Sequence, residues 1–218
     1  MTKTANITGR SARDRLSPES TVDRTLTATL ACISEKGIAA TSTHAIAERA
    51  GLNQGNIHYH FRNKDQLFLR LLEVLYENSR ENIREVSQSE LTPRAKLEAI
   101  VDLGFDLISR RRDEFVALIA YWAHAMCAGP AWRRAYRQTF ESFRAAVKSI
   151  IRDGEARGDF KSGSAEMASV MLVGIIQGVG LQCAMAPDQV ELETARLWSR
   201  ELLDSLLPAP KQGQAAAG

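Results

Sequence analysis

The sequence is poor in the features that mark secreted, zinc-binding and redox-bridged proteins. Its 218 residues include only three cysteines, Cys32, Cys127 and Cys183, which are odd in number and have no Cys-x-x-Cys spacing. That usage argues against a disulfide framework and against a structural zinc site. The first residues are Thr, Ser, Arg and Lys without an apolar stretch, so we expect no signal peptide. These absences favour a protein of the reducing cytoplasm.

Long hydrophobic runs are also scarce, with one exception at residues 167–186. This run is about as long as a membrane span, but Ser169, Gln177 and Gln182 interrupt it. Small residues at several positions suit close packing against other helices. We therefore interpret the run as a buried helix of a bundle and expect no membrane partner. The small residues are Gly174, Gly178, Gly180 and Ala184.

The charge is unevenly distributed along the chain. The formal net charge is only +2, and the composition, 44% hydrophobic and 25% charged, is typical of a globular protein with a sizeable core. Residues 1–63, however, contain eight Lys and Arg against five Asp and Glu, whereas residues 64–218 contain 20 against 21. The positive excess therefore lies in the N-terminal part, where it favours contact with a polyanion.

Residues 41–64 have the pattern of two short helices joined by a glycine turn. A first helix from about Thr43 places Ile46 and Ala50 on one face, where small side chains let a second helix cross closely. Gly51 follows as a helix cap that can adopt a positive φ. The pattern predicts a helix-turn-helix.

The second helix of this motif, roughly residues 54–60, needs few of its side chains for a core. Only Ile57 and the following Phe61 are expected to be buried. Polar and aromatic donors without a core role suit a helix that docks in the major groove of DNA. His58 and His60 are two residues apart, so their side chains diverge and are not expected to share a metal. The residues expected to dock are Gln54, Gly55, Asn56, His58, Tyr59 and His60.

The motif resembles the DNA-binding signature of the TetR-type transcriptional regulators. Residues 45–67 match Ala-Ile-Ala-x-x-Ala-Gly-x-x-x-Gly-x-x-x-Tyr-x-Phe-x-x-Lys-x-x-Leu without a gap. His58 stands where that family more often has Tyr, and Asn56 where Thr or Leu is common, which would alter the operator sequence and not the docking mode. The resemblance implies a homodimeric repressor that leaves its operator when a small molecule binds. It implies no cofactor and no enzymatic activity.

Three further residues are expected to fix the position of the motif on DNA. The resemblance implies a base or phosphate contact for His44, and Thr43 lies beside it. Lys64 lies at the start of the next helix, where Asn63 and Gln66 have the form of a capping box. A cation there opposes the helix dipole unless a phosphate lies opposite, so we expect Lys64 to contact a phosphate.

The helical periodicity continues to the end of the chain without strand-like alternation, so the whole fold is predicted to be all-α. We divide it into a disordered basic arm (1–16), a helix-turn-helix domain (17–65), a larger helical domain for effector binding and dimerisation (66–207) and a disordered tail (208–218). The first helix is expected to begin after Ser17 or Ser20 and to end at Gly37. The helices expected in the larger domain, after a long one that runs to about Val86, are residues 94–111, 113–127, 131–156, 164–186 and 188–207.

Two of these helices are expected to form the dimer. The helix at 164–186 is apolar on nearly every face, so it must be covered on every face, and a second copy would cover it. Two such helix pairs would form a four-helix bundle. The residues expected at this interface are Val170, Gly174, Gly178, Leu181, Trp198 and Leu202.

Aromatic residues form two stripes on the helices at 113–127 and 131–156, and these stripes are expected to face each other. Trp and Tyr carry polar atoms that need partners when buried, and Met and Cys adapt to cavities. Residues 120–134 are also similar to the choline-sensing repressors of betaine synthesis, which points to an aromatic effector pocket without identifying the effector. The expected pocket residues are Trp122, His124, Met126, Cys127, Trp132, Tyr136, Phe140 and Gln177.

Two other classes of protein remain as alternatives. A helical enzyme or small-molecule-binding protein needs a catalytic constellation or a ligand site, but the spacing supports no Ser/His/Asp, Cys/His or paired-carboxylate set. A redox sensor would work through Cys127 or Cys183, and His124 lies three residues before Cys127.

Overall fold

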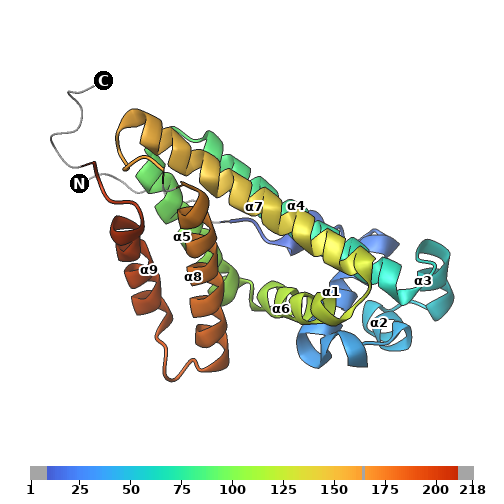
Figure 1. The fold of residues 1–218 in the computed structure, drawn as a ribbon. Helices are drawn as coiled ribbons and strands as arrows, with labels where there is room; N and C mark the ends of the chain where they lie inside the picture. Colours follow the sequence, from blue (N-terminus) through green and yellow to red (C-terminus); the bar gives the residue numbers. More distant parts are fainter. Residues whose placement is uncertain (1–8, 164, 211–218) are drawn as a thin grey trace. The chain divides into compact units, whose positions relative to one another are not determined.

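The computed structural model describes residues 9–163 and 165–210, and all regular structure in these ranges is helical (Figure 1). The all-α prediction is thus confirmed. Four of the five helices expected after residue 90 agree with the structure to within one residue at each end. The elements are η1 (Ala12–Arg15), α1 (Thr21–Ala40), α2 (Thr43–Ala50), α3 (Gln54–His60), α4 (Lys64–Gln88), α5 (Pro93–Arg110), α6 (Arg112–Cys127), α7 (Pro130–Arg157), α8 (Ala165–Met185) and α9 (Leu192–Leu206).

The chain forms two compact units. The first, here called the motif unit, consists of Arg10–Arg80 and Arg111–Thr139. The second, the bundle unit, contains Glu81–Arg110 and Phe140–Gly218, together with Met1–Gly9. Helices α4 and α7 therefore contribute residues to both units. The predicted domain boundary at residue 65 stays a prediction. In the structure, α6 belongs to the same compact unit as the helix-turn-helix.

Helix α1 is the central helix of the motif unit. Ser20 caps its N-terminus by accepting a hydrogen bond from the Asp23 N–H at 3.3 Å. Its buried face packs against α2, α3 and α6. Gly37 has φ 75°, which L-residues with a side chain rarely adopt, and it separates the last residues of α1 from the regular helix. The expected break at Gly37 is present, although helical turns resume up to Ala40.

The N-terminal segment differs from the expectation of a disordered arm. Residues 1–8 of the predicted arm lie outside the described residues, but η1 is ordered and Ala12 is fully buried. The buried carboxylate of Glu114, on α6, accepts hydrogen bonds from the Ser11 hydroxyl and, at 2.8 Å, from the Ala12 N–H. The sequence pattern missed this segment because a short 3₁₀ turn held by a distant carboxylate has no apolar periodicity.

The bundle unit is built from α5, α8 and α9 with the second part of α7. Helices α5 and α8 approach closely at Gly104, because a Cβ atom there would lie 2.3 Å from the Ile176 Cγ2 atom. Helices α8 and α9 pair side by side (Figure 1).

The start of α9 was predicted four residues too early. Glu191 caps this helix by accepting a hydrogen bond from the Thr194 N–H at 3.0 Å, so the preceding residues form a turn. The predicted tail lies outside the described residues beyond residue 210.

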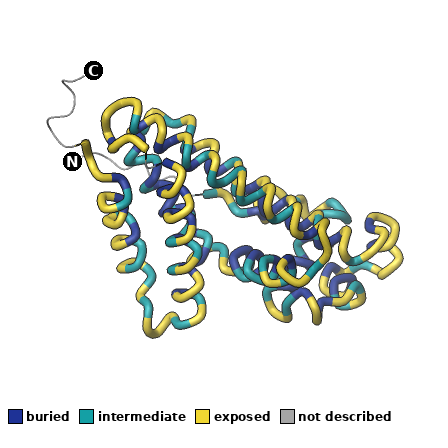
Figure 2. The backbone as a smooth tube through the Cα atoms, viewed as in Figure 1, coloured by how far each residue is buried: buried dark blue, intermediate teal, exposed yellow. Residues whose placement is uncertain are grey.

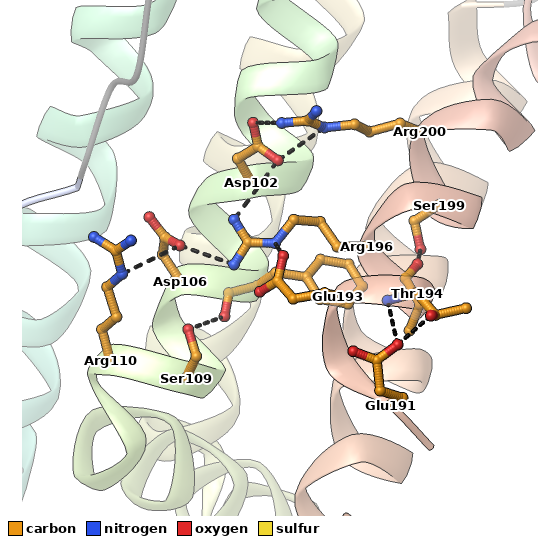
Figure 3. Close-up of polar contacts among 12 residues, drawn as sticks. Asp102, Asp106, Ser109, Arg110, Glu191, Glu193, Thr194, Arg196, Ser199 and Arg200 are labelled. Atoms are coloured by element: carbon orange, nitrogen blue, oxygen red, sulfur yellow. Dashed lines mark hydrogen bonds and ion pairs between the residues drawn. The ribbon is translucent and has the colours of Figure 1, made fainter.

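Ion pairs attach α9 to α5 (Figure 3). Arg196 donates to Asp106 at 2.9 Å, and Arg200 forms two hydrogen bonds with Asp102, one of them at 2.9 Å. The Asp106 side chain is only 7% exposed. A buried carboxylate requires such a partner, because an unpaired charge away from water is very costly.

Candidate nucleic-acid interface and ligand site

The predicted helix-turn-helix is present in the structure as α2, a tight turn and α3. Ser42 and Asn53 cap the two helices, each accepting a hydrogen bond from a backbone N–H three residues later. Gly51 closes the turn with φ 62° and ψ 38°, the left-handed conformation expected from its position. Ile57 and Phe61 anchor α3 in the core of the motif unit.

The remaining side chains of α3 point away from the core. Tyr59 is 86% exposed, and its ring lies edge to face with that of His60 at 5.0 Å. The Tyr59 side chain is therefore available for contact with another molecule. Of the residues predicted to contact DNA, those exposed are His44, Gln54, Gly55, His58, Tyr59 and His60, and those partly exposed are Thr43, Asn56 and Lys64.

Two of the residues predicted to contact DNA form a hydrogen bond with each other. The Gln54 Nε2 atom donates to the Thr43 hydroxyl at 2.9 Å, and both side chains belong to the first residue of their helix. This bond orients the Gln54 amide at the N-terminus of α3. A glutamine held in this way suits hydrogen bonding to an adenine edge.

The side chain of Lys64 is turned toward the protein. Its Nζ atom donates to the backbone carbonyl of Thr41 at 3.2 Å and lies 5.4 Å from the centre of the Phe68 ring. This internal partner of the ammonium group is not predicted by the sequence pattern, because Thr41 lies 23 residues away. The predicted phosphate contact stays a prediction, and the observed geometry gives Lys64 a structural contact within the motif unit.

Two arginines outside the predicted set support the motif. Arg24, on α1, donates to the backbone carbonyls of Ala50 at 2.6 Å and Gly51 at 3.2 Å, and so binds the C-terminus of α2. Arg49 forms two hydrogen bonds of 2.6 Å with the carboxylate of Glu35. This pairing lowers the pKa of Glu35. An arginine at position 24 carries no local signal of its distant partner, so the sequence could not assign this role.

Aromatic side chains from α4, α6 and α7 gather in the motif unit. The rings of Tyr121 and Trp132 stack with their centres 5.9 Å apart, and His124 lies edge to face with Trp132 at 4.7 Å. Trp122 lies edge to face with Tyr136 at 6.5 Å. The two predicted stripes therefore face each other, and the structure brings together four of the eight residues predicted for the pocket.

Two tyrosines complete this aromatic cluster, which we define as Tyr76, Tyr121, Trp122, His124, Trp132 and Tyr136. Burial raises the pKa of Tyr121 well above its usual value, and it raises the pKa of Tyr76 against the opposing effect of the nearby Trp122 indole. Both hydroxyls therefore stay protonated near neutral pH. The buried Tyr76 hydroxyl has no hydrogen-bond partner of standard geometry in the described part of the chain.

The other residues predicted for the pocket are placed elsewhere. Met126 is 78% exposed and Cys127 is exposed, at the end of α6. Both were predicted to line a cavity; the structure leaves them exposed and outside the set of rings in contact, so this role stays a prediction. Phe140 and Gln177 belong to the bundle unit, so their relation to the aromatic cluster stays a prediction.

A groove of about 690 Å³ runs between α4 and α7 in the motif unit. It has the volume of a small-molecule site. Tyr76 is the member of the aromatic cluster that lines it, and His60, the last residue of α3, lies at its wall. Its other walls carry both charges, including Arg70, Glu73 and Arg80. The groove thus reaches from Tyr76 of the cluster to the end of α3.

Many residues of α8 and α9 in the bundle unit are exposed (Figure 2). We call the large apolar residues among them the apolar surface. Trp198 is 63% exposed, and both Gly174 and Gly178 have open space where a Cβ atom would lie. Helix α8 is long and apolar enough to cross a membrane, and 39% of that stretch is buried within the chain. The exposed large residues here are Met167, Val170, Met171, Leu181, Met185, Leu197, Trp198 and Leu202.

The cysteines and acidic groups offer little further chemistry. Cys32 and Cys183 are buried, and burial raises the pKa of Cys183, which disfavours its reactive thiolate form. Cys127 is exposed. Among the described residues, no group of three or more His, Cys, Asp or Glu side chains is arranged to hold a metal ion.

Comparison with known proteins covers both parts of the chain. Residues 26–71 match the family model of bacterial regulatory proteins of the tetR family, and residues 93–208 match that of the C-terminal domain of BetI-type transcriptional repressors. The regulator TtgR of Pseudomonas putida is 28% identical over 185 residues, which cover 81% of this chain and 86% of TtgR. BetI of Yersinia pestis is 26% identical over 175 residues, covering 78% of this chain and 84% of BetI.

Solved structures share the fold. A TetR transcription regulator from Haloarcula marismortui is 30% identical with a TM-score of 0.75, covering 85% of this chain and 97% of that one. A transcriptional regulator from Saccharomonospora viridis, solved in complex with choline, has a TM-score of 0.79 and 21% identity, covering 85% and 96%. The latter likeness concerns the fold alone.

Proposed function

Because this chain belongs to the TetR family of bacterial transcriptional regulators and is a ligand-responsive DNA-binding repressor of that family, we propose that it binds a palindromic operator as a homodimer. We also propose that it leaves the operator when a ligand binds in the aromatic cluster. The observation that carries the first part is the exposure of the polar and aromatic side chains of α3, Tyr59 above all. We expect the protein to act in the cytoplasm, where its DNA lies.

In the proposed complex, α3 lies in the major groove. Asn56, His58 and His60 face the bases, with Tyr59 against a base or sugar, while Gly55 lets the helix approach closely. Gln54, oriented by Thr43, reads one base pair at the start of α3. His44 contacts the adjacent backbone. Phosphate contacts of this kind position a protein, and base contacts give specificity.

The test of DNA binding is selection of duplexes from a random-sequence pool, followed by titration at several salt concentrations. Affinity should fall steeply as salt rises, because neutralised phosphates release counterions. Asn56→Ala should change the preference at particular base pairs by roughly 1–3 kcal/mol. A protein that enriches no sequence at moderate salt would contradict the proposal.

Dimerisation is proposed through the apolar surface of α8 and α9. Large exposed apolar patches are rare on monomeric proteins. The exposed glycines Gly174 and Gly178 allow a second α8 to approach closely. Two motif units would then read half-sites about 34–36 Å apart. Gly178→Arg should prevent this packing, and sedimentation of the wild-type chain as a monomer at micromolar concentration would refute the dimer.

The effector is proposed to enter the aromatic cluster. The cluster offers ring faces and neutral polar atoms, so an uncharged hydrophobic compound with one acceptor for the Tyr76 hydroxyl fits it best. A second candidate is a quaternary ammonium compound, because indole and phenol faces attract such cations. Tryptophan fluorescence and operator release, with choline as the cationic probe, distinguish the two. If Trp122→Ala leaves the potency of a releasing compound unchanged in folded protein, the site lies elsewhere.

Regulation by oxidation is the alternative mechanism, and the exposure of Cys127 is the observation that favours it. Mass spectrometry after mild peroxide treatment, combined with operator titration, separates it from ligand sensing. Under the ligand proposal, Cys127→Ser retains both operator binding and operator release.

A further inference from the structure

The groove between α4 and α7 is separate from the aromatic cluster. Tyr76 is the residue that the two have in common, and the Tyr76 hydroxyl is buried. The groove is also lined by Val22 of α1 and His60 of α3, which belong to the helices around the helix-turn-helix. The groove is therefore a candidate ligand site in its own right.

The inner surface of the groove is largely apolar. Phe61 and Leu72 line it and are buried. On α7, the small side chains of Ala131 and Ala135 lie one turn apart and leave the space open. The residues of α4 that line the groove run from Gln66 to Arg80, which is about 21 Å of helix at about 1.5 Å per residue. An elongated ligand with an apolar body fits this shape.

The charged residues along the groove leave one positive charge uncompensated. Arg70 pairs with Glu73 at 2.5 Å, and Glu77 lies 3.9 Å from the same guanidinium group. Arg80, further along α4, is exposed, and within residues 9–163 and 165–210 it forms no hydrogen bond or ion pair. Its guanidinium group can bind a carboxylate through two parallel hydrogen bonds. The groove therefore favours a ligand with a single negative charge.

We propose that this groove binds an elongated organic monoanion, with its carboxylate on Arg80 and its apolar body over Phe61 and Leu72. The far end of the body then lies against His60. This site goes beyond the proposed function, because the effector proposed for the aromatic cluster is uncharged or cationic. The proposal also does not depend on DNA binding, so a wild-type protein that selects no operator leaves it open to the same test.

The first experiment is calorimetric titration of the full chain with decanoate below its micellar concentration. Decanol and decyltrimethylammonium are matched probes with the same apolar chain and a neutral or cationic head. Decanoate should bind most tightly, with saturation at one molecule per chain. Equal affinities for the three probes, or decanoate uptake that does not saturate, overturn the proposal.

The second experiment assigns the head group of the probe to Arg80. Arg80→Met should weaken decanoate binding by about fivefold to tenfold, because hydrogen bonds to charged groups are among the stronger ones, and should leave decanol binding unchanged. Arg80→Lys, which keeps the charge, should recover part of the loss. Arg133→Met removes an exposed arginine of α7 outside the groove and is the control. An equal loss in the Arg80→Met and Arg133→Met variants refutes the assignment.

The third experiment distinguishes the groove from the aromatic cluster. Decanoate should shift the NMR signals of the Ala135 methyl group and the His60 ring, and leave the Trp132 indole N–H unchanged. Ala135→Leu fills the groove and should weaken both decanoate and decanol, whereas Ala123→Leu, at an exposed position of α6, should weaken neither. If Trp132 shifts and Ala135 does not, decanoate occupies the cluster and the groove is not its site.

Discussion

Helices α6 and α9 are attached to their units by opposite kinds of chemistry. In the motif unit, the middle of α6 is held by stacked rings and a buried neutral hydroxyl. In the bundle unit, α9 is held on α5 by arginine and aspartate pairs (Figure 3). Neutral buried contacts depend little on salt or pH, while ion pairs depend on both. The middle of α6, which would bind the ligand, is therefore expected to depend less on ionic conditions than α9, which lies at the proposed dimer surface.

The largest effect is expected from Arg196→Met in the bundle unit. It leaves the buried Asp106 without its arginine partner on α9, and breaking a buried pair in this way costs about 3–5 kcal/mol. Denaturant unfolding measures the loss. Adding Asp106→Asn should recover much of it, and Glu193→Gln, at a side chain 69% exposed, should change stability by less than about 0.5 kcal/mol. Equal effects of the Arg196 and Glu193 changes would contradict the comparison.

A smaller effect is expected in the motif unit from Gly51→Ala. The left-handed conformation of Gly51 is strained for alanine, at a cost of about 1–2 kcal/mol. Gly51→Asn is the matched control, because asparagine tolerates this conformation better. Thermal unfolding should rank the variants as wild type, Asn, Ala. If alanine proves as stable as glycine, the turn is not the determinant of this motif.

The smallest effect concerns pH. Burial raises the pKa of Asp102, against the opposing effect of Arg200 and Arg196, so the folded state binds this proton more tightly than the unfolded chain does. Its contribution to stability therefore increases as pH falls from above the raised pKa toward the ordinary value of 3.8. Glu35 behaves oppositely, because its pKa is lowered and its contribution is lost on acidification. Carboxyl NMR titration should show Asp102 titrating above, and Glu35 below, its ordinary range.

Local patterns predicted most of the fold and part of the site. Helix period, Gly51 and the caps located the motif because each depends on neighbours in sequence. Tyr121 was missed because its hydroxyl bonds to a residue 53 positions away. The exposure of Met126 and Cys127 was not predicted, because helical spacing does not reveal what packs against the last turn of α6. The roles of Arg24 and Glu114 were also not predicted, because their partners, like that of Tyr121, are distant in the chain.

The bond between Glu114 and the chain before α1 has a practical consequence for anyone shortening this protein. A truncation that begins at Pro18 would look harmless in the sequence, because the preceding residues have the composition of a tail. It would nevertheless remove the Ser11 hydroxyl and the Ala12 N–H from a carboxylate that is 3% exposed. A shortened chain would then contain a buried anion without these two donors at the first turn of α6, and would be expected to purify poorly or to precipitate on storage.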